Sequence, residues 1–322
     1  MTDMDYDEME EFTGELFRVF GLKVTAFSLL LVIGAVIGLI MALRRARRGR
    51  VSQDAVLWFA MLGIPLGLFF ARLIYCLLRI REVKYNGFWY IFRLDYGGFT
   101  VMGAAIGLAL AAWITRRITK EKIIDLLDAV LPGLLMVLAL ERFAEGATRN
   151  GTGLEVTVRG LQFFPLARPG VYADMYTYAV HMFEGFTALV ASVYTQGMDA
   201  PRGRAAGTGL ILTAAAQVIW ESLRRDDRLM FMMASWLMIF SAALLFLVLI
   251  LCLLRLDWPL GGKLIAAGGF ILLAAATGAM QFFMEGKMVH TIPTGVCFAL
   301  SCLTTAGLTW LSLRVLWAAT EE

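Results

Sequence analysis

Charged residues and histidines are scarce in this sequence. Lys, Arg, Asp and Glu make up 17% of its 322 residues, against about 25% in soluble domains, which argues against an ordinary water-soluble fold. Only two histidines are present, His181 and His290, and no Ser-His-Asp or Cys-His site can be assembled around them. The chain also lacks a P-loop, a dinucleotide fingerprint and a basic–aromatic platform, so nucleotide and nucleic-acid binding are not indicated.

Cysteine is equally sparse, and the sequence indicates neither a disulfide framework nor a metal site. His181 and Glu184, three residues apart, would give a metal ion only two ligands. We therefore expect no metal and no cofactor. The four cysteines fall within apolar runs and are interpreted as small packing residues: Cys76, Cys252, Cys297 and Cys302.

Long apolar runs dominate what is present, since hydrophobic residues make up 59% of the chain. A helix needs about 20 apolar residues to cross the ~30 Å hydrocarbon core of a bilayer. The runs predict an all-α fold, a polytopic transmembrane helical bundle. Its nine spans are expected near residues 24–43, 55–78, 97–115, 123–141, 176–198, 206–222, 231–254, 264–284 and 294–313.

The basic clusters predict how the chain is oriented in the membrane. Acidic residues from Asp3 to Glu11 precede the first span, and five arginines from Arg44 to Arg50 follow it. Because Lys and Arg favour the cytoplasmic side, the N-terminus is predicted outside, and the clusters at 44–50 and 116–122 inside. The acidic head has no basic n-region, which argues against a cleaved signal peptide. Residues 1–22 are thus expected to form an acidic segment, outside or interfacial.

Polar residues near the ends of predicted spans are candidates for function, because an ionisable group at membrane depth is costly unless paired or hydrated. Arg72 and Tyr75 lie near the end of the second span, where a snorkelling Arg beside an interfacial Tyr is the alternative interpretation. Arg142 follows the fourth span, where it could pair with neighbouring glutamates or offer a planar fork to a phosphate. Glu221 and Arg224 share one helical face, which an ordinary charged helix end would also explain.

The order of these segments resembles the prolipoprotein diacylglyceryl transferase family, over roughly residues 20 to 255. No single segment is specific, but seven occur in the same order as in the family. They are the run Leu22 to Leu43 with Arg44-Arg45 after it, Ala71-Arg72-Leu73-Ile74-Tyr75, Gly97 to Gly107, Asp128 to Pro132, Leu140 to Gly153, His181-Met182-Phe183-Glu184 and Trp220-Glu221-Ser222-Leu223-Arg224.

The resemblance implies an enzyme of the bacterial plasma membrane that moves the diacylglyceryl group of phosphatidylglycerol onto the lipobox cysteine thiol of a prolipoprotein. The partners it implies are phosphatidylglycerol, the prolipoprotein lipobox segment and the lipid bilayer, with no nucleic acid. It also implies Arg142 as the phosphate contact, since a cation is expected where charge develops on a leaving group. Glu145 is the candidate catalytic base, and the other candidate substrate-binding residues are Arg72, Tyr75, Glu184, Glu221 and Arg224.

Several positions depart from the family pattern. Met102 stands where the family has a histidine, and Gln217 where it has an arginine, while Glu145 and Thr148 stand where it has asparagines. Two alternatives therefore remain open beside a divergent transferase: a non-catalytic member that binds lipid or lipoprotein, and a membrane transporter. The expected domains are the segment 1–22, a transferase-like membrane domain of about seven spans over 23–255, and a two-span C-terminal extension over 256–322.

Overall fold

The computed structural model describes residues 15–19, 22–93, 97–148, 150–170, 175–226, 229–231, 234–285 and 293–321. Most of the predicted acidic segment, together with Arg149 and His290, lies outside these ranges. The chain divides into two compact units, a larger one of residues 1–40 and 131–322 and a smaller one of residues 41–130.

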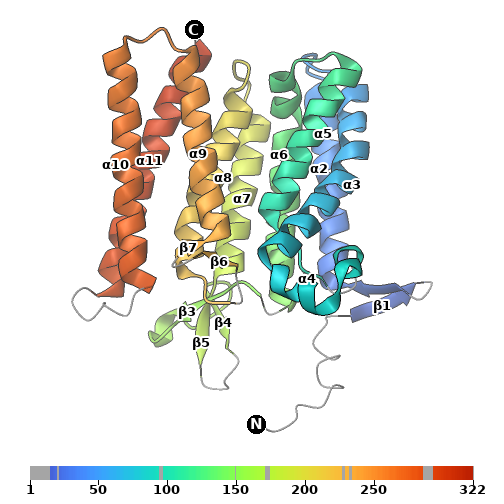
Figure 1. The fold of residues 1–322 in the computed structure, drawn as a ribbon, viewed down its shortest axis with the longest axis vertical. Helices are drawn as coiled ribbons and strands as arrows, with labels where there is room; N and C mark the ends of the chain where they lie inside the picture. Colours follow the sequence, from blue (N-terminus) through green and yellow to red (C-terminus); the bar gives the residue numbers. More distant parts are fainter. Residues whose placement is uncertain are drawn as a thin grey trace. The chain divides into compact units, whose positions relative to one another are not determined.

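Long helices make up most of the structure (Figure 1). Within the described residues, seven of them are long and apolar enough to cross a membrane, by length and composition. This confirms the prediction of an all-α, polytopic membrane protein. The seven are α2 (Ala26–Ala46), α3 (Gln53–Leu78), α5 (Val101–Thr119), α6 (Ile123–Glu145), α9 (Trp236–Arg255), α10 (Leu260–Glu285) and α11 (Thr294–Glu321).

Two further helices form where the fifth and sixth spans were predicted, but they are not among these seven. They are α7 (Val180–Gly197) and α8 (Arg204–Leu223). Both helices carry charged or polar residues among small ones, and much of α8 is buried, from Ala205 to Gly209 and again at its C-terminal end. Helices covered by protein need less apolar surface than helices that face lipid.

Short strands and helices join the long helices, and the sequence analysis did not predict them. Between α6 and α7, β3 (Thr152–Glu155), β4 (Ala167–Pro169) and β5 (Tyr176–Ala179) form an antiparallel sheet in the order β3-β5-β4. The predicted fifth span therefore begins four residues too early, because residues 176–179 pair in this sheet. The other short elements are β1 (Glu15–Val19), β2 (Leu22–Thr25), α4 (Ile80–Asn86), η2 (Phe88–Phe92), η4 (Gly146–Thr148), η5 (Arg159–Leu161), β6 (Met230–Phe231) and β7 (Ala234–Ser235).

The smaller unit is built on the close packing of α3 against α5. Gly103 and Gly107 lie against the backbone of α3 at Phe70 and Leu66, so a side chain at either glycine would overlap that backbone. Small residues permit such backbone approach between membrane helices. At one end of this unit the backbone N–H of Ser52 donates to Glu121 at 3.2 Å. The segments that follow α2 and α5, which carry the two basic clusters, therefore lie at the same end.

Two sets of contacts organise the larger unit. Gly38 of α2 and Gly133 of α6 are in backbone contact, and Ser192 of α7 donates to the carbonyl of Pro132 at 2.7 Å. Further along the chain, α11 packs against α8, α9 and α10. Arg204 at the start of α8 donates to Thr320 of α11 at 2.9 Å. The C-terminal helix pair is thus packed onto the helices that precede it.

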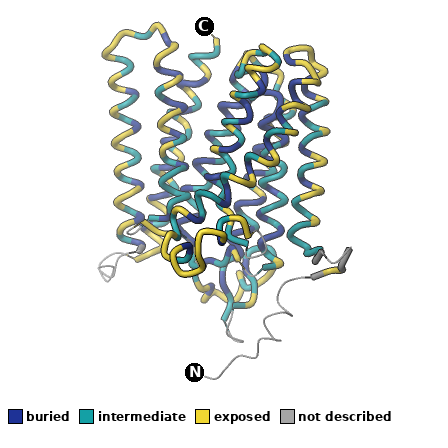
Figure 2. The backbone as a smooth tube through the Cα atoms, turned by 45° about the vertical axis from the view of Figure 1, so that its right-hand side comes forward, coloured by how far each residue is buried: buried dark blue, intermediate teal, exposed yellow. Residues whose placement is uncertain are grey.

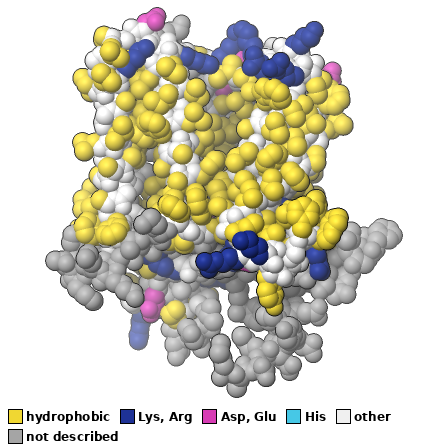
Figure 3. All heavy atoms as spheres, viewed as in Figure 1, with side chains coloured by type: hydrophobic (Ala, Val, Ile, Leu, Met, Phe, Trp, Pro, Cys, Tyr) yellow, Lys and Arg dark blue, Asp and Glu magenta, His cyan; other side chains and the backbone are white. Residues whose placement is uncertain are grey.

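The surfaces of the helices are apolar over most of their length. Buried and exposed positions alternate along each helix (Figure 2), and exposed apolar side chains include Val36 on α2 and Leu272 on α10. Figure 3 shows hydrophobic side chains along the helices, with Lys and Arg side chains gathered at helix ends. The four cysteines are free thiols: Cys76, Cys252 and Cys297 are buried, and Cys302 is half-buried.

Candidate functional site

Arg72 of α3, a predicted substrate-binding residue, is bonded to backbone carbonyls. Its side chain is buried, and it donates to the carbonyl oxygens of Tyr90 at 2.9 Å and Arg93 at 3.1 Å. Further bonds reach the carbonyls of Ile91, Gly97 and Gly98. One guanidinium therefore binds five backbone carbonyls of the segment that follows α4 and holds that segment against α3.

Tyr75, one turn along α3, lies against the same segment. Gly98 has a positive φ of 73°, and a Cβ there would lie 2.5 Å from the Tyr75 ring. The Tyr75 hydroxyl donates to Glu82 at 3.4 Å. A hydrogen bond from Arg79 holds the pKa of Glu82 below its ordinary value, against a smaller opposing effect of burial. Arg72 and Tyr75 thus stabilise one loop of the smaller unit.

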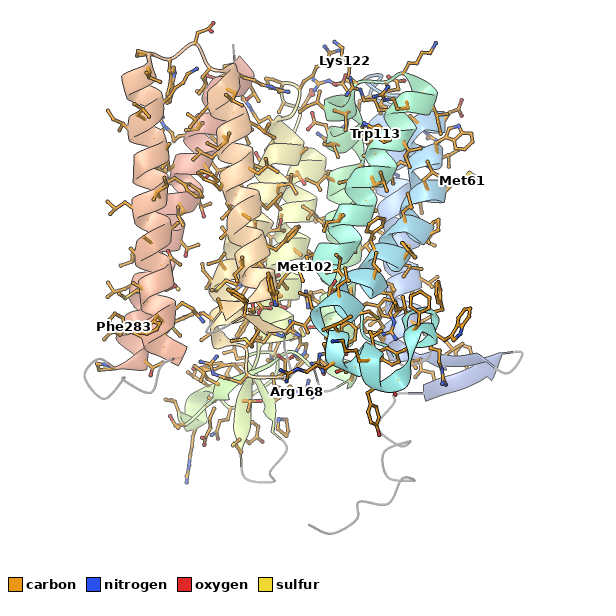
Figure 4. The ribbon with its side chains drawn as sticks, viewed as in Figure 1. Met61, Met102, Trp113, Lys122, Arg168 and Phe283 are labelled. Carbon is orange, nitrogen blue, oxygen red and sulfur yellow. The ribbon has the colours of Figure 1, made fainter. Side chains whose placement is uncertain are left out.

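Met102, which stands where the family has a histidine, is a buried residue of α5. Figure 4 shows it at the end of the helix nearer α4, with Trp113 toward the other end. It follows Val101, the first residue of α5, whose N-cap Thr100 accepts a hydrogen bond from the N–H of Gly103. Its thioether cannot act as a proton acceptor at neutral pH, so any base must come from elsewhere.

The larger unit brings the remaining predicted site residues together at the ends of α6, α7 and α8. Arg142 lies near the end of α6, buried, with its Nη1 2.7 Å from Glu145 Oε1 and its Nε 3.3 Å from Glu184 Oε2. Glu141 Oε2 lies 3.5 Å from the same Nε. No hydrogen bond of Arg142 Nη2 occurs among the described residues. Nε lies near two carboxylates but also makes no hydrogen bond among these residues, so both nitrogens have unused donors.

Arg224, just after α8, binds the same carboxylates from the other side. Its Nη2 lies 3.1 Å from Glu145 Oε1, and its Nη1 lies 3.1 Å from Glu184 Oε2 and 3.7 Å from Glu221 Oε1. Glu145 and Glu184 are therefore each shared by two guanidiniums. Buried charges are tolerated only when paired in this way.

Gln217 completes the contacts of Glu184. Its Nε2 donates to Glu184 Oε1 at 2.6 Å and to Glu221 Oε1 at 3.3 Å. A neutral amide at this position ties together two carboxylates that would otherwise repel each other.

Asp226 belongs to the cluster although the sequence analysis did not single it out. It accepts from Arg224 Nη2 at 2.9 Å and from the backbone N–H of Gly151 at 2.7 Å. Burial would raise the pKa of Asp226, but the hydrogen bonds and charge of Arg224, with the Gly151 N–H, outweigh it and hold the pKa below its ordinary value of 3.8. Asp226 thus ties the loop after α6 to the end of α8. In the sequence, the only indication that Asp226 could join the cluster was its position two residues after Arg224, beyond the end of a predicted helix.

Acidic groups outnumber basic ones in this arrangement. The two guanidiniums of the cluster face five carboxylates, those of Glu141, Glu145, Glu184, Glu221 and Asp226. All predicted site residues of the larger unit lie in this cluster, and their roles stay predictions. Arg72 and Tyr75 belong to the smaller unit.

Residues 15–254 match the family model described as prolipoprotein diacylglyceryl transferase. The chain belongs to the prolipoprotein diacylglyceryl transferase family. The match ends at the last residues of α9, so α10 and α11 lie beyond it.

Several relatives within this family are similar to the chain at modest identity. The phosphatidylglycerol–prolipoprotein diacylglyceryl transferase of Gloeobacter violaceus is 25% identical over 221 residues, 65% of this chain and 81% of its own length. That of Oceanobacillus iheyensis is 23% identical over 220 residues, 65% of this chain and 76% of its own. That of Streptococcus suis is 25% identical over 245 residues, 73% and 89% of the two chains.

Proposed function

We propose that this protein is a diacylglyceryl transferase of the bacterial plasma membrane, acting on phosphatidylglycerol and on the lipobox cysteine of a prolipoprotein. The observation that carries the proposal is the family match over residues 15–254, within which Arg142, Glu145, Glu184, Glu221 and Arg224 form one buried cluster. Neither of the alternatives, a non-catalytic lipid-binding member or a transporter, is favoured by a specific observation.

The reaction forms a thioether. The cysteine sulfur attacks the glyceryl carbon of the donor, the bond between that carbon and the phosphate oxygen breaks, and the electron pair remains on the oxygen of the departing glycerol phosphate. A positioned cation stabilises the charge that develops there. We assign this role to Arg142, because its Nη1 is hydrogen-bonded to Glu145 while Nη2 and Nε make no hydrogen bond within the described residues.

The other members of the cluster hold Arg142 in place. Arg224 binds Glu145 and Glu184 from the opposite side, so that the two carboxylates and two guanidiniums fix one another. Proton acceptance by Glu145 and substrate contact by Glu184, Glu221 and Arg224 stay predictions. So does substrate contact by Arg72 and Tyr75, whose described contacts stabilise a loop.

The test uses the full chain purified into phosphatidylglycerol vesicles with a peptide that carries a lipobox cysteine. We expect a peptide heavier by one diacylglyceryl group, and a loss of about 10²–10³-fold in kcat for Arg142→Lys, which keeps the charge but loses the planar fork. The matched control is Arg314→Lys, an exposed arginine over the Trp310 ring. Correctly folded protein that binds the lipid without forming product would refute the proposal and favour the non-catalytic alternative; flux of a solute into vesicles would favour transport.

A further inference from the structure

The acceptor thiol must lose its proton before it attacks, since the thiolate is the nucleophile. Glu145 and Asp226 are poorly suited to take that proton, because each is hydrogen-bonded to a guanidinium that stabilises its charged form. Glu145 lies within 3.1 Å of both Arg142 and Arg224. Glu184 and Asp226 are bound to Arg224 at 3.1 and 2.9 Å. A basic nitrogen outside these ion pairs is a better candidate for the proton acceptor than Glu145 or Asp226.

His181, the second residue of α7, lies beside the cluster and takes no part in its ion pairs. Its Nδ1 is 3.2 Å from the carbonyl oxygen of Gly151, and its backbone N–H donates to the same oxygen at 3.1 Å. A carbonyl oxygen can only accept, so Nδ1 carries the ring proton. The lone pair then lies on Nε2, and its direction is fixed by the bond that Nδ1 makes.

Nε2 of His181 faces glycine and makes no hydrogen bond within the described part of the chain. A Cβ at Gly146 would lie 2.8 Å from Nε2, and one at Gly151 would lie 2.5 Å from the His181 Cβ. Two residues without side chains thus flank the imidazole. Because Gly146 directly follows Glu145, the ring lies next to the residue that joins both guanidiniums.

Charged groups face His181 from three elements. Glu145 comes from α6, Arg168 from β4 and Arg224 from the end of α8. Arg168 approaches the same loop, with its Nη1 3.4 Å from the carbonyl oxygen of Gly146 (Figure 4). With Asp226, which is bound to the backbone N–H of Gly151, these groups place charges of both signs around the imidazole.

We propose that Nε2 of His181 accepts the proton of the acceptor thiol, an inference that rests on the proposed transferase function. The S–H bond breaks, its proton forms a bond to Nε2, and the sulfur forms the new bond to the glyceryl carbon as the carbon–oxygen bond to phosphate breaks. The imidazolium then returns its proton to the departing glycerol phosphate, which restores the neutral ring.

The test compares His181→Asn with the wild type in the vesicle assay. The Asn side-chain amide can still donate to Gly151, but it offers no basic nitrogen. At pH 7 we expect kcat to fall about 10²–10⁴-fold with little change in KM for the lipid, the range for loss of a general base. The deficit should shrink above about pH 8.5, where the free thiol ionises without help. His290→Asn, the same change at the chain's other histidine, is the control and should keep the wild-type pH profile.

A second measurement needs no variant. A peptide with selenocysteine in place of the acceptor cysteine is already deprotonated at neutral pH, so it bypasses the base. With wild-type protein, we expect the rate for the cysteine peptide to fall as the pH is lowered and His181 becomes protonated, while the rate for the selenocysteine peptide stays nearly constant.

The outcomes separate the two proposals. If wild-type protein modifies neither peptide, the transferase function fails, and the role of His181 fails with it. If wild type is active and His181→Asn matches it at pH 7, only the role of His181 is refuted. If His181→Asn loses the same fraction of kcat with both peptides, and that loss stays constant up to pH 10, His181 has a structural role and its role as a base is refuted. A change of pH profile in His290→Asn would also refute the role of His181.

Discussion

Replacing Arg224 by methionine would remove one charge from the buried cluster while keeping most of the side-chain volume. In the wild type this guanidinium binds Glu145 and Glu184 at 3.1 Å and Asp226 at 2.9 Å, and its side chain is only 9% exposed. In the variant, Glu145 and Glu184 share Arg142 with Glu141, while Asp226 and Glu221 lose their guanidinium partner and Asp226 keeps backbone N–H groups such as that of Gly151. Five carboxylates thus remain with one cation among them.

The expected cost follows from that loss of pairing. Removing one partner of a buried ion pair costs about 3–5 kcal/mol, because the other charge stays buried and uncompensated. At roughly 2–4 °C per kcal/mol, the unfolding midpoint should fall by on the order of 10 °C. Asp226→Asn added to Arg224→Met should recover about 1–3 kcal/mol, since it removes the carboxylate left with least compensation.

The dependence of stability on pH gives an independent test of the contribution of Asp226. Because its folded-state pKa is lowered, Asp226 contributes stability that is complete above its ordinary value of 3.8 and is lost as the pH falls through the lower folded-state value. Arg224→Met should reduce that contribution.

Unfolding is followed by intrinsic tryptophan fluorescence of the full chain in detergent, between pH 3 and 8. Arg117→Met is the matched control: Arg117 is exposed on α5 over the Trp113 ring, so its loss should cost well under 1 kcal/mol. A midpoint for Arg224→Met within about 1 °C of the wild type would refute the reasoning. So would a double variant less stable than Arg224→Met alone.

Two further predictions concern backbone contacts. Arg72→Lys should destabilise the smaller unit by about 2–4 kcal/mol, because one ammonium cannot reach all the carbonyls that Arg72 binds and leaves some unpaired. Faster tryptic cleavage after Arg93 would report this destabilisation, and an unchanged cleavage rate would contradict the prediction. Gly133→Ala should cost about 1–3 kcal/mol through overlap with the backbone of Gly38, whereas Gly268→Ala, with nothing within 4 Å of its Cβ, should stabilise α10 by roughly 0.5–1 kcal/mol. Thermal unfolding of both glycine variants gives the comparison, and equal shifts would show that the Gly38 contact is not limiting.

The long helices could be predicted from sequence because a membrane span depends on local composition. The run from Leu29 to Ile40 is apolar whatever surrounds it, and it forms α2. The strands of the β3-β5-β4 sheet could not be found in this way, since each is three or four residues long and is defined by pairing with residues far along the chain. Tyr176 to Ala179 has an apolar and aromatic sequence that suits a span equally well, and only its partners make it a strand.

Residue type and order along the chain suggested several members of the buried cluster, although their roles stay predictions. Arg142, Glu184 and Arg224 were identified by type and order, and they do form one cluster. The partners of Arg72 could not be identified, because they are backbone carbonyls, which every residue has. The excess of carboxylates over guanidiniums in the cluster could not be predicted either, since Asp226 joins the cluster only through the turn that follows α8.

The positions of the cysteines bear on how a thiol-modifying enzyme avoids modifying itself. Cys76, Cys252 and Cys297 are buried in α3, α9 and α11, and Cys302 is half-buried in α11. A diacylglyceryl adduct is far larger than the space around a packed thiol, so the three buried sulfurs are shielded from the donor lipid and that of Cys302 is shielded in part. The same shielding has a practical use. A cysteine placed at a chosen surface position would be the most accessible thiol of the described chain, which allows site-directed labels to be introduced against a low background.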